Sequence, residues 1–343
     1  MPSQLATPAL LPYDHLKRLS DHVGLFEHAL GDTPRIDHGY CVDDVARGLL
    51  VVAREPHPDE DLQRLASTYL RFLENAAVQD GRVHNRMRFA GQWTDEAAVG
   101  DCWGRALWAL GTMGSRMSAL APQSRRTFRV LARQRCGDVR AAAFAALGAG
   151  ELLLAGRRSP RTYRLLADAV TKIPTKPTAS WDWPEPRLRY ANAALAEAIM
   201  VAGRALSDRD LEQRGLELIS ALIAIETRDG HLSVCGTSGR GPGEKGPQFD
   251  QQPIEVAAIA DAAARAFDFT GQSDWRDVVA MSWAWFLGDN DSAVAMIDPV
   301  SGAGFDGLEP EGRNDNRGAE STLAALSTWQ QARRLGVVPG PTA

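Results

Sequence analysis

Cysteine is scarce in this sequence, and its four cysteines form no recognisable pattern. Cys41, Cys102, Cys136 and Cys235 lie far apart, with no Cys-x-x-Cys pair and no cysteine–histidine spacing. Structural zinc sites need such spacings, and domains built on disulfides are small and dense in cysteine. The cysteines therefore predict reduced, mostly buried thiols in a cytoplasmic protein.

Long hydrophobic runs and a surplus of positive charge are also missing. No stretch approaches the roughly 20 apolar residues of a membrane-spanning helix. Residues 1–12 lack the positive-then-apolar order of a signal peptide. The net charge is −5, from 38 basic and 43 acidic residues. This balance argues against nucleic acid and anionic membranes as partners.

The sequence lacks the standard motifs for nucleotide binding, a nucleophilic serine or a catalytic metal ion in the structural context that each requires. No Gly-x-Gly-x-x-Gly loop joins a predicted strand to a helix, and no Gly-x-x-x-x-Gly-Lys-Ser/Thr, Gly-x-Ser-x-Gly or His-Glu-x-x-His occurs. The seven histidines are scattered. Asp43 and Asp44 lack the third acid of an Asp-Asp-x-x-Asp metal site, because Arg47 stands in its place. We therefore predict neither a cofactor nor a metal ion.

What is present is a repeated pair of helical patterns. One set of predicted helices is rich in Ala and Leu, poor in charge, and begins near Asp44, Asp101, Asp138, Asn192, Glu255 and Glu320. An amphipathic segment precedes each of them, at residues 13–22, 59–77, 122–133, 159–172, 208–226 and 274–287. Helices that are apolar all round are buried, whereas amphipathic ones face water. The two sets therefore predict inner and outer helices.

Six such pairs predict an all-α fold, an (α/α)6 toroid or barrel. We expect one domain over residues 1–335 and a frayed tail at 336–343. The spacing is too irregular for an open solenoid of fixed repeats. Turn-rich runs at 80–84, 229–233 and 301–307 indicate short β-hairpins on the rim where the inner helices begin. The Gly- and Pro-rich run 236–247 is predicted to be a mobile flap over the same mouth.

Carboxylates stand at or just before five of the six inner-helix starts. They are Asp43 and Asp44, Asp101, Asp182 and Glu185, Asp250 and Glu255, and Asp315 and Glu320. Carboxylates that converge on one cavity repel one another, so some of their pKa values should rise. Glycoside cleavage needs one protonated carboxylic acid and one carboxylate. Tryptophans near the same mouth would suit stacking on sugar rings.

A structural role competes with the catalytic one for each acid. A single Asp at a helix start is commonly an N-terminal cap, and acids in the first turn favour that end of the helix dipole. Asp44 and Glu320 lie slightly further inside apolar helices, so the structural alternative to a catalytic role is a buried salt bridge. Arg47, Arg105 and Arg317 are available partners.

Five longer motifs give the chain a resemblance to a family of bacterial proteins. They are Gly-Tyr-Cys-x-Asp-Asp-x-Ala-Arg at 39–47, Asp-Cys-x-Gly-Arg-Ala-Leu-Trp-Ala-Leu-Gly at 101–111, Trp-x-Trp-x-Glu-x-x-Leu-x-Tyr-x-Asn at 181–192, Phe-Asp-Gln-Gln-Pro-x-Glu at 249–255 and Gly-Ala-Glu-Ser-Thr-Leu-Ala at 318–324. Members are often labelled glycosyltransferase because the domain accompanies a glycosyltransferase domain in longer chains. The resemblance implies an (α/α)6 fold like that of glycosidases and a functional link to a glycosyltransferase.

These observations predict a metal-independent glycoside hydrolase that acts on an oligosaccharide. Candidates for the acid, base or nucleophile are Asp44, Asp101, Glu185, Asp250, Glu255 and Glu320. Candidates for substrate binding are His38, Tyr40, Asp43, Trp103, Arg105, Trp181, Asp182, Trp183, Tyr190, Asn192, Gln251 and Gln252. An epimerase, lyase or phosphorylase on the same barrel is a second hypothesis. A glycan-binding module that assists a glycosyltransferase is a third.

Overall fold

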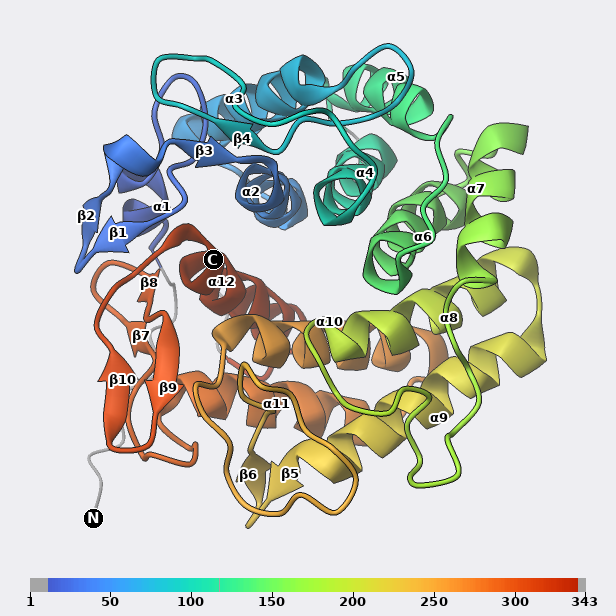
Figure 1. Cartoon of the computed structure of the whole chain (residues 1–343), viewed down its shortest axis with the longest axis vertical. Helices are drawn as coiled ribbons and strands as arrows, with labels where there is room; N and C mark the ends of the chain where they lie inside the picture. Colours follow the sequence, from blue (N-terminus) through green and yellow to red (C-terminus); the bar gives the residue numbers. More distant parts are fainter. Residues whose placement is uncertain (1–11, 117, 339–343) are drawn as a thin grey trace.

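Six helices that are buried on nearly every side form the inner ring of the protein (Figure 1). The computed structural model describes residues 12–116 and 118–338. The inner helices are α2 (Val42–Arg54), α4 (Asp101–Ser115), α6 (Val139–Leu154), α8 (Asn192–Leu206), α10 (Pro253–Thr270) and α12 (Ala319–Arg334). Each begins within two residues of its predicted start. Their Ala- and Leu-rich sequences leave no face suited to water, so burial between neighbours is the favourable arrangement.

The outer helices alternate with the inner ones along the chain. They are α1 (Asp14–Arg18), α3 (Glu60–Ala76), α5 (Ala121–Leu131), α7 (Pro160–Val170), α9 (Arg209–Glu226) and α11 (Asp274–Leu287). Each inner helix packs against the next, and α12 packs against α2, which closes the ring. The predicted all-α (α/α)6 toroid is confirmed.

The first outer helix is much shorter than predicted. We expected a helix over residues 13–22, but α1 contains only five residues. The Asp21 side chain accepts hydrogen bonds from the backbone N–H groups of Val23 and Gly24, at 2.8 and 3.0 Å. Such a turn competes with the helical hydrogen bonds and ends the helix early.

The segments that connect the helices contain short antiparallel strand pairs. They are β1 (Ala29–Leu30) with β2 (Thr33–Pro34), β3 (Tyr40–Cys41) with β4 (Arg86–Met87), β5 (Thr227–Arg228) with β6 (His231–Leu232), β7 (Ile297–Asp298) with β8 (Ala303–Gly304), and β9 (Gly307–Glu309) with β10 (Gly312–Asn314). The hairpins predicted at 229–233 and 301–307 are confirmed. The run 80–84 forms a turn closed by an isolated β-bridge between Ala77 and Val83, rather than a hairpin of two strands. A short 3-10 helix, η1 (Ile36–His38), precedes β3.

Helices α4 and α6 approach each other closely through glycine. A Cβ atom on Gly111 would lie 2.1 Å from the carbonyl oxygen of Gly148, and one on Gly148 would lie 2.2 Å from that of Leu107. Both distances are far below a van der Waals contact, so only glycine permits this packing. Since these are inner helices, the close approach narrows the ring.

The C-terminal end of the described chain packs against α12. The backbone N–H of Val337 donates to the Ala332 carbonyl at 2.8 Å, and Val338 is buried. Of the tail predicted at 336–343, residues 339–343 lie outside the described part. Within the described residues, no helix combines the length and apolar character that crossing a membrane requires.

Candidate active site

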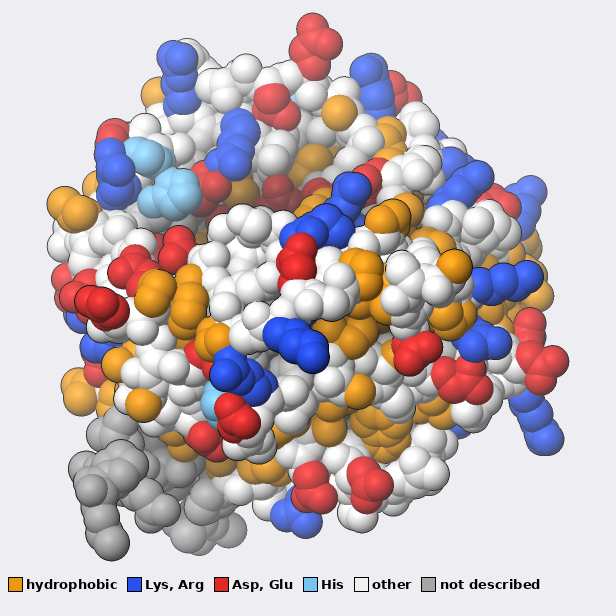
Figure 2. All heavy atoms as spheres, turned by 60° about the horizontal axis from the view of Figure 1, so that its bottom comes forward, with side chains coloured by type: hydrophobic (Ala, Val, Ile, Leu, Met, Phe, Trp, Pro, Cys, Tyr) orange, Lys and Arg blue, Asp and Glu red, His pale blue; other side chains and the backbone are white. Residues whose placement is uncertain are grey.

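A cavity of about 450 Å³ opens where the inner helices begin. It is lined by Glu27, His28, Cys41, Asp43, Asp44, Arg47, Arg86, Asp101, Arg105, Tyr190, Ala191, Gln252, Ile254, Glu255, Asp306, Gly318, Glu320 and Ser321. Figure 2 views this rim obliquely and shows acidic, basic and histidine side chains around a hollow in the upper part of the surface. Seven carboxyl groups and three arginines therefore share one space.

The cavity acids do not act as N-terminal caps. At α3, α7 and α9 the capping side chains are Asp59, Ser159 and Asp208, which accept backbone N–H groups of the first turn. Helices α2, α4, α8, α10 and α12 have no such side-chain cap. The acids of α2, α4, α10 and α12 occupy the first three positions of their helices and line the cavity instead. Capping therefore does not explain why these positions are acidic.

Arg47 joins two of the cavity carboxyl groups. Its Nη1 lies 2.5 Å from Asp44 Oδ1, and its Nη2 lies 2.6 Å from Glu320. Asp44 is 3% exposed. Burial raises the pKa of Asp44 to about 6, against the attraction of Arg47 and with further repulsion from Glu320, Glu27 and Asp43. Asp44 is thus an acid that can hold a proton near neutral pH.

On the α4 side of the cavity, two carboxylates differ in their partners. Asp43 Oδ1 lies 3.4 Å from Arg105 Nε, and neither atom makes a hydrogen bond to a described residue. Asp101 is paired with the hydroxyl of Tyr190, and burial raises its pKa. The misaligned Asp43–Arg105 pair leaves buried polar atoms available to a ligand, because such atoms are costly to leave unpaired.

Glu255, at the start of α10, is held by the chain entering α8. It accepts the backbone N–H of Ala191 at 2.5 Å, and the N–H and side-chain amide of Asn192 at 3.3 Å. Burial raises the pKa of Glu255, while these hydrogen bonds lower it. Ala191 has φ 49°, a left-handed conformation that costs a non-glycine residue about 1 kcal/mol. The contacts to Glu255 offset that cost and fix the carboxylate orientation.

Arg140 links Glu185 to the residues that hold Glu255. Its two terminal nitrogens bind both oxygens of Glu185, and Nη2 also donates to Asn192 Oδ1 at 3.3 Å. Its Nε donates to the Tyr190 carbonyl at 3.0 Å. Glu185 does not line the cavity. The contacts place it behind the cavity wall, where it orients Arg140 and, through Arg140, Asn192.

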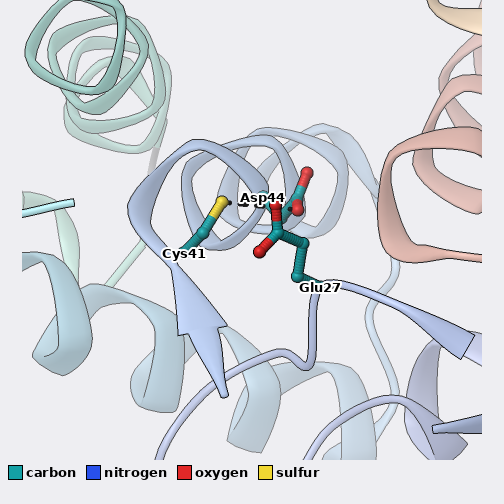
Figure 3. Close-up of side chains that lie close together, drawn as sticks. All are labelled: Glu27, Cys41 and Asp44. Atoms are coloured by element: carbon teal, nitrogen blue, oxygen red, sulfur yellow. Dashed lines mark hydrogen bonds between the residues drawn. The ribbon is translucent and has the colours of Figure 1, made fainter. Parts of the chain in front are cut away.

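Glu27, Cys41 and Asp44 form a compact group beside the first turn of α2 (Figure 3). One ligand atom from each lies within 4.8 Å of the others. However, Arg86 pairs with Glu27 and Arg47 with Asp44. Burial also raises the pKa of the Cys41 thiol, with a further contribution from Asp44, and a metal ligand must be a thiolate. The group is therefore compensated by arginine and does not fit a cation.

The structure brings together about half of the predicted site residues. Those that line the cavity are Asp43, Asp44, Asp101, Arg105, Tyr190, Gln252, Glu255 and Glu320. Those that do not are Glu185, Asp250, His38, Tyr40, Trp103, Trp181, Asp182, Trp183, Asn192 and Gln251. Asp182, Asp250 and His38 are exposed, while Tyr40 donates to Asp21 and Gln251 to Asp291.

The predicted tryptophan platform is absent from the described cavity wall. Trp103 is buried and donates from Nε1 to the Leu131 carbonyl, and Trp183 is fully buried. Trp181 donates to the Glu185 carbonyl. Trp103 and Trp183 pack in the protein interior and Trp181 is half-buried against it, because the apolar area of these side chains favours burial over exposure at the mouth. The aromatic ring that does line the cavity is that of Tyr190.

Six charged or titratable lining residues were not among the predicted site residues. They are Glu27, His28, Cys41, Arg47, Arg86 and Asp306. Arg47 is on α2, and the other five lie in loops or short strands. Asp306 accepts hydrogen bonds from Gly318 N at 2.7 Å and Ser321 Oγ at 2.9 Å, which ties the β8–β9 loop to α12. The Gly-rich run around Asp306 was the signal that could have indicated it.

Solved structures with the same ring of helices include several enzymes that act on sugars. A sugar epimerase from a ruminal bacterium matches with a TM-score of 0.72 and 14% identity, over 93% of this chain and 95% of that chain. A D-mannose isomerase matches with a TM-score of 0.70 and 13% identity, over 94% of each chain. A cellulase of C. cellulolyticum in complex with cellobiose matches with a TM-score of 0.62 and 9% identity, over 90% of this chain and 87% of that chain. These similarities establish the (α/α)6 fold.

Sequence comparison adds no closer relationship. No family model matches this chain, and no curated protein sequence matches it.

Proposed function

We propose that this protein is a sugar-acting enzyme, and specifically a glycoside hydrolase that uses a pair of carboxyl groups. The observation that carries the proposal is the position of Asp44. It is buried in the cavity wall, has a pKa raised to about 6, and shares the cavity with Asp101 and Glu255. Glycoside cleavage requires a carboxylic acid that protonates the leaving oxygen and a second carboxylate that activates water or attacks the sugar.

In this mechanism Asp44 is the general acid. Asp101 and Glu255, on α4 and α10, are the candidates for the second role. Glu255 is oriented by backbone N–H groups, which favour its ionised form. Asp101 has fewer hydrogen-bond partners and can hold a water molecule. Asp43 and Arg105 offer unpaired polar atoms to sugar hydroxyl groups.

A sugar epimerase or isomerase is the second candidate. His28 lines the cavity, and its ring lies 5.0 Å from that of His38 in an edge-on arrangement. Histidine is the side chain best suited to carry a proton near neutral pH. Matched structures include an epimerase and an isomerase, which supports this candidate at the level of fold.

A phosphorylase is less favoured by the charges. Seven carboxyl groups line this cavity against three arginines, and Arg47 and Arg86 already form close ion pairs, so an added phosphate would be repelled by the surplus of negative charge. A lyase, and a glycan-binding module linked to a glycosyltransferase, remain hypotheses without a supporting contact. In the second of these, the cavity would bind a glycan with no turnover.

One incubation with two readouts separates the enzyme candidates. A panel of disaccharides is incubated in ²H₂O, and the release of reducing ends is followed together with deuterium incorporation at carbon. A hydrolase releases reducing ends without exchange at carbon. An epimerase or isomerase incorporates deuterium into an intact sugar. Binding of a disaccharide in calorimetry, with neither reducing ends released nor deuterium incorporated, would support the glycan-binding module and contradict both enzymes.

Amide variants then assign the carboxyl groups. Asp44→Asn, Asp101→Asn and Glu255→Gln keep the size of each side chain and remove its acid–base function. Loss of general acid–base catalysis reduces kcat about 10²- to 10⁴-fold. The matched control is Glu60→Gln, an exposed acid in the first turn of the outer helix α3. Near wild-type rates in all three variants, with unchanged melting temperatures, would rule out the two-carboxylate mechanism at these residues.

A further inference from the structure

A second cavity, of about 380 Å³, lies at the opposite end of the barrel. Arg54 is the last residue of α2, Arg116 follows the end of α4, and Arg334 is the last residue of α12, so this cavity faces the C-terminal ends of the inner helices. A smaller space of about 40 Å³ lies between the two cavities; most of its lining is apolar, and it shares Arg105 with the first cavity and Asp261 with the second. The first and second cavities have no lining residue in common.

Five arginines line this second cavity: Arg54, Arg116, Arg265, Arg333 and Arg334. Cations near helix C-termini are favoured by the helix dipole, which accounts for some of them structurally. It does not account for their convergence. The pKa of Arg116 is lowered by burial and by the charges of Arg54, Arg265 and Arg334, against the attraction of Glu151.

Several guanidinium edges in the cavity have no protein partner among the described residues. Arg54 donates to Asp261 and Ser327 through Nη1 alone. Arg265 donates to Glu197 through Nε and to Glu151 through Nη2, which leaves its Nη1. Arg116 forms no ion pair with any residue in 12–116 or 118–338. Arg54, Arg265 and the exposed Arg116 thus line one space with N–H groups that bind no other described residue.

The acids of the cavity do not fully balance these cations. Glu197 is 1% exposed, and its nearest cationic partner, Arg265 Nε, is 3.4 Å away. Burial raises the pKa of Glu197 to about 7, against Arg265 and with repulsion from Asp261. Five arginines and four carboxyl groups line the cavity, and Arg333 is also paired with Glu55, which does not line it. The partly protonated Glu197 therefore gives this balanced set a small excess of positive charge near neutral pH.

We propose that this second cavity binds the phosphate group of a small molecule, through Arg116 and the unpaired edges of Arg54 and Arg265. Guanidinium groups recognise phosphate through paired N–H donors. A tetrahedral phosphate accepts hydrogen bonds from three directions, as three arginines can supply them, whereas a planar carboxylate suits one or two arginines. The volume exceeds that of free phosphate and leaves room for an attached sugar.

Isothermal titration calorimetry on the full chain tests the proposal, with inorganic phosphate, glucose 6-phosphate, glucose and succinate at constant ionic strength. We expect heat with both phosphates and none with glucose or succinate. Tighter binding of glucose 6-phosphate, by tenfold or more, would identify a sugar phosphate as the ligand, and equal affinity would identify free phosphate. No binding of either phosphate at millimolar concentration, or equal binding of succinate, would overturn the proposal.

Variants locate the binding. Arg116→Gln should weaken phosphate binding at least tenfold. Arg116→Lys should weaken it less, because lysine keeps the positive charge but lacks the planar guanidinium with its paired N–H donors. Arg126→Gln, an exposed arginine on the outer helix α5, is the matched control and should bind as wild type does. Circular dichroism verifies folding. Loss of binding in Arg105→Gln, with full binding in Arg116→Gln, would place the phosphate in the first cavity and refute the proposal.

Discussion

Arg47 Nη2 lies 2.6 Å from the Glu320 carboxylate, although the two residues are at opposite ends of the chain. Arg47 is on α2, the first inner helix, and Glu320 is on α12, the last. The ion pair therefore spans the seam at which the ring closes. Since Arg47 also binds Asp44, closure of the ring and the protonation of the proposed acid depend on one guanidinium group.

Replacing Arg47 should affect both properties. Arg47→Met leaves two carboxyl groups without their cation, and removing one partner of a buried ion pair costs about 3–5 kcal/mol. We expect a clear fall in melting temperature. We also expect the pKa of Asp44 to rise further, because the attraction of Arg47 is lost. Denaturant unfolding measures the first effect and the pH–rate profile the second. An unchanged melting temperature would show that the seam does not depend on this pair.

The raised pKa of Asp44 predicts two pH effects. A hydrolase with Asp44 as its acid should lose activity as the pH rises through about 6, because the proton is lost. The folded protein binds this proton more tightly than the unfolded chain does. The protonated Asp44 therefore stabilises the folded state by about 3 kcal/mol below about pH 4, and this contribution is lost as the pH rises from 4 to 6.

Asp44→Asn isolates that contribution from those of other acids. The variant should lack the fall that Asp44 contributes, so the unfolding free energy of the wild type should decrease relative to that of the variant by about 3 kcal/mol between pH 4 and 6, measured by urea unfolding. Glu60→Gln, on the surface, should follow the wild-type curve. Parallel curves for Asp44→Asn and wild type would contradict a raised pKa at Asp44.

Glu185 is predicted to act by positioning rather than by touching substrate. Glu185→Gln removes the charge that orients Arg140, so Asn192 and Ala191 should hold Glu255 less firmly. We expect a lower kcat with little change in KM, and a shifted pH–rate profile. The matched control is Glu212→Gln, which breaks a similar two-pronged pair with Arg204 far from the cavity. An equal loss of activity in both variants would indicate general destabilisation.

The α4–α6 contact predicts a site of severe overpacking. In Gly111→Ala the added methyl group would lie 2.1 Å from the Gly148 carbonyl oxygen. Backbone must then move, so we expect a loss of about 3 kcal/mol, the upper part of the range for overpacked cores. Gly137→Ala is the control, because a Cβ atom there meets nothing within 4 Å. Thermal unfolding of both variants checks the difference, and equal stability would refute the close contact.

The order of inner and outer helices could be predicted from the sequence because it depends on local information. Hydrophobic periodicity separates a buried helix from a surface helix, and capping residues such as Asp59 and Asp208 mark where helices begin. The hairpin at 229–233 is equally local, since an Asp-Gly turn needs only its own residues. The acids at the starts of α2, α4, α10 and α12 could also be predicted, because the start of a helix is marked by local sequence.

Which of those acids enter the cavity was decided by the tertiary structure alone. Glu185 and Glu255 both stand near helix starts, but Arg140, 45 residues from Glu185, draws that carboxylate behind the wall. Trp103 and Trp183 turn inward because distant helices provide an apolar environment. Loop residues such as His28 reach the cavity only once the ring has closed. Short-range interactions along the chain are enough to order the helices and to place most of them, although α1 ends earlier than its sequence pattern indicates. The tertiary structure determined the site, because its ion pairs and hydrogen bonds join residues far apart in the chain.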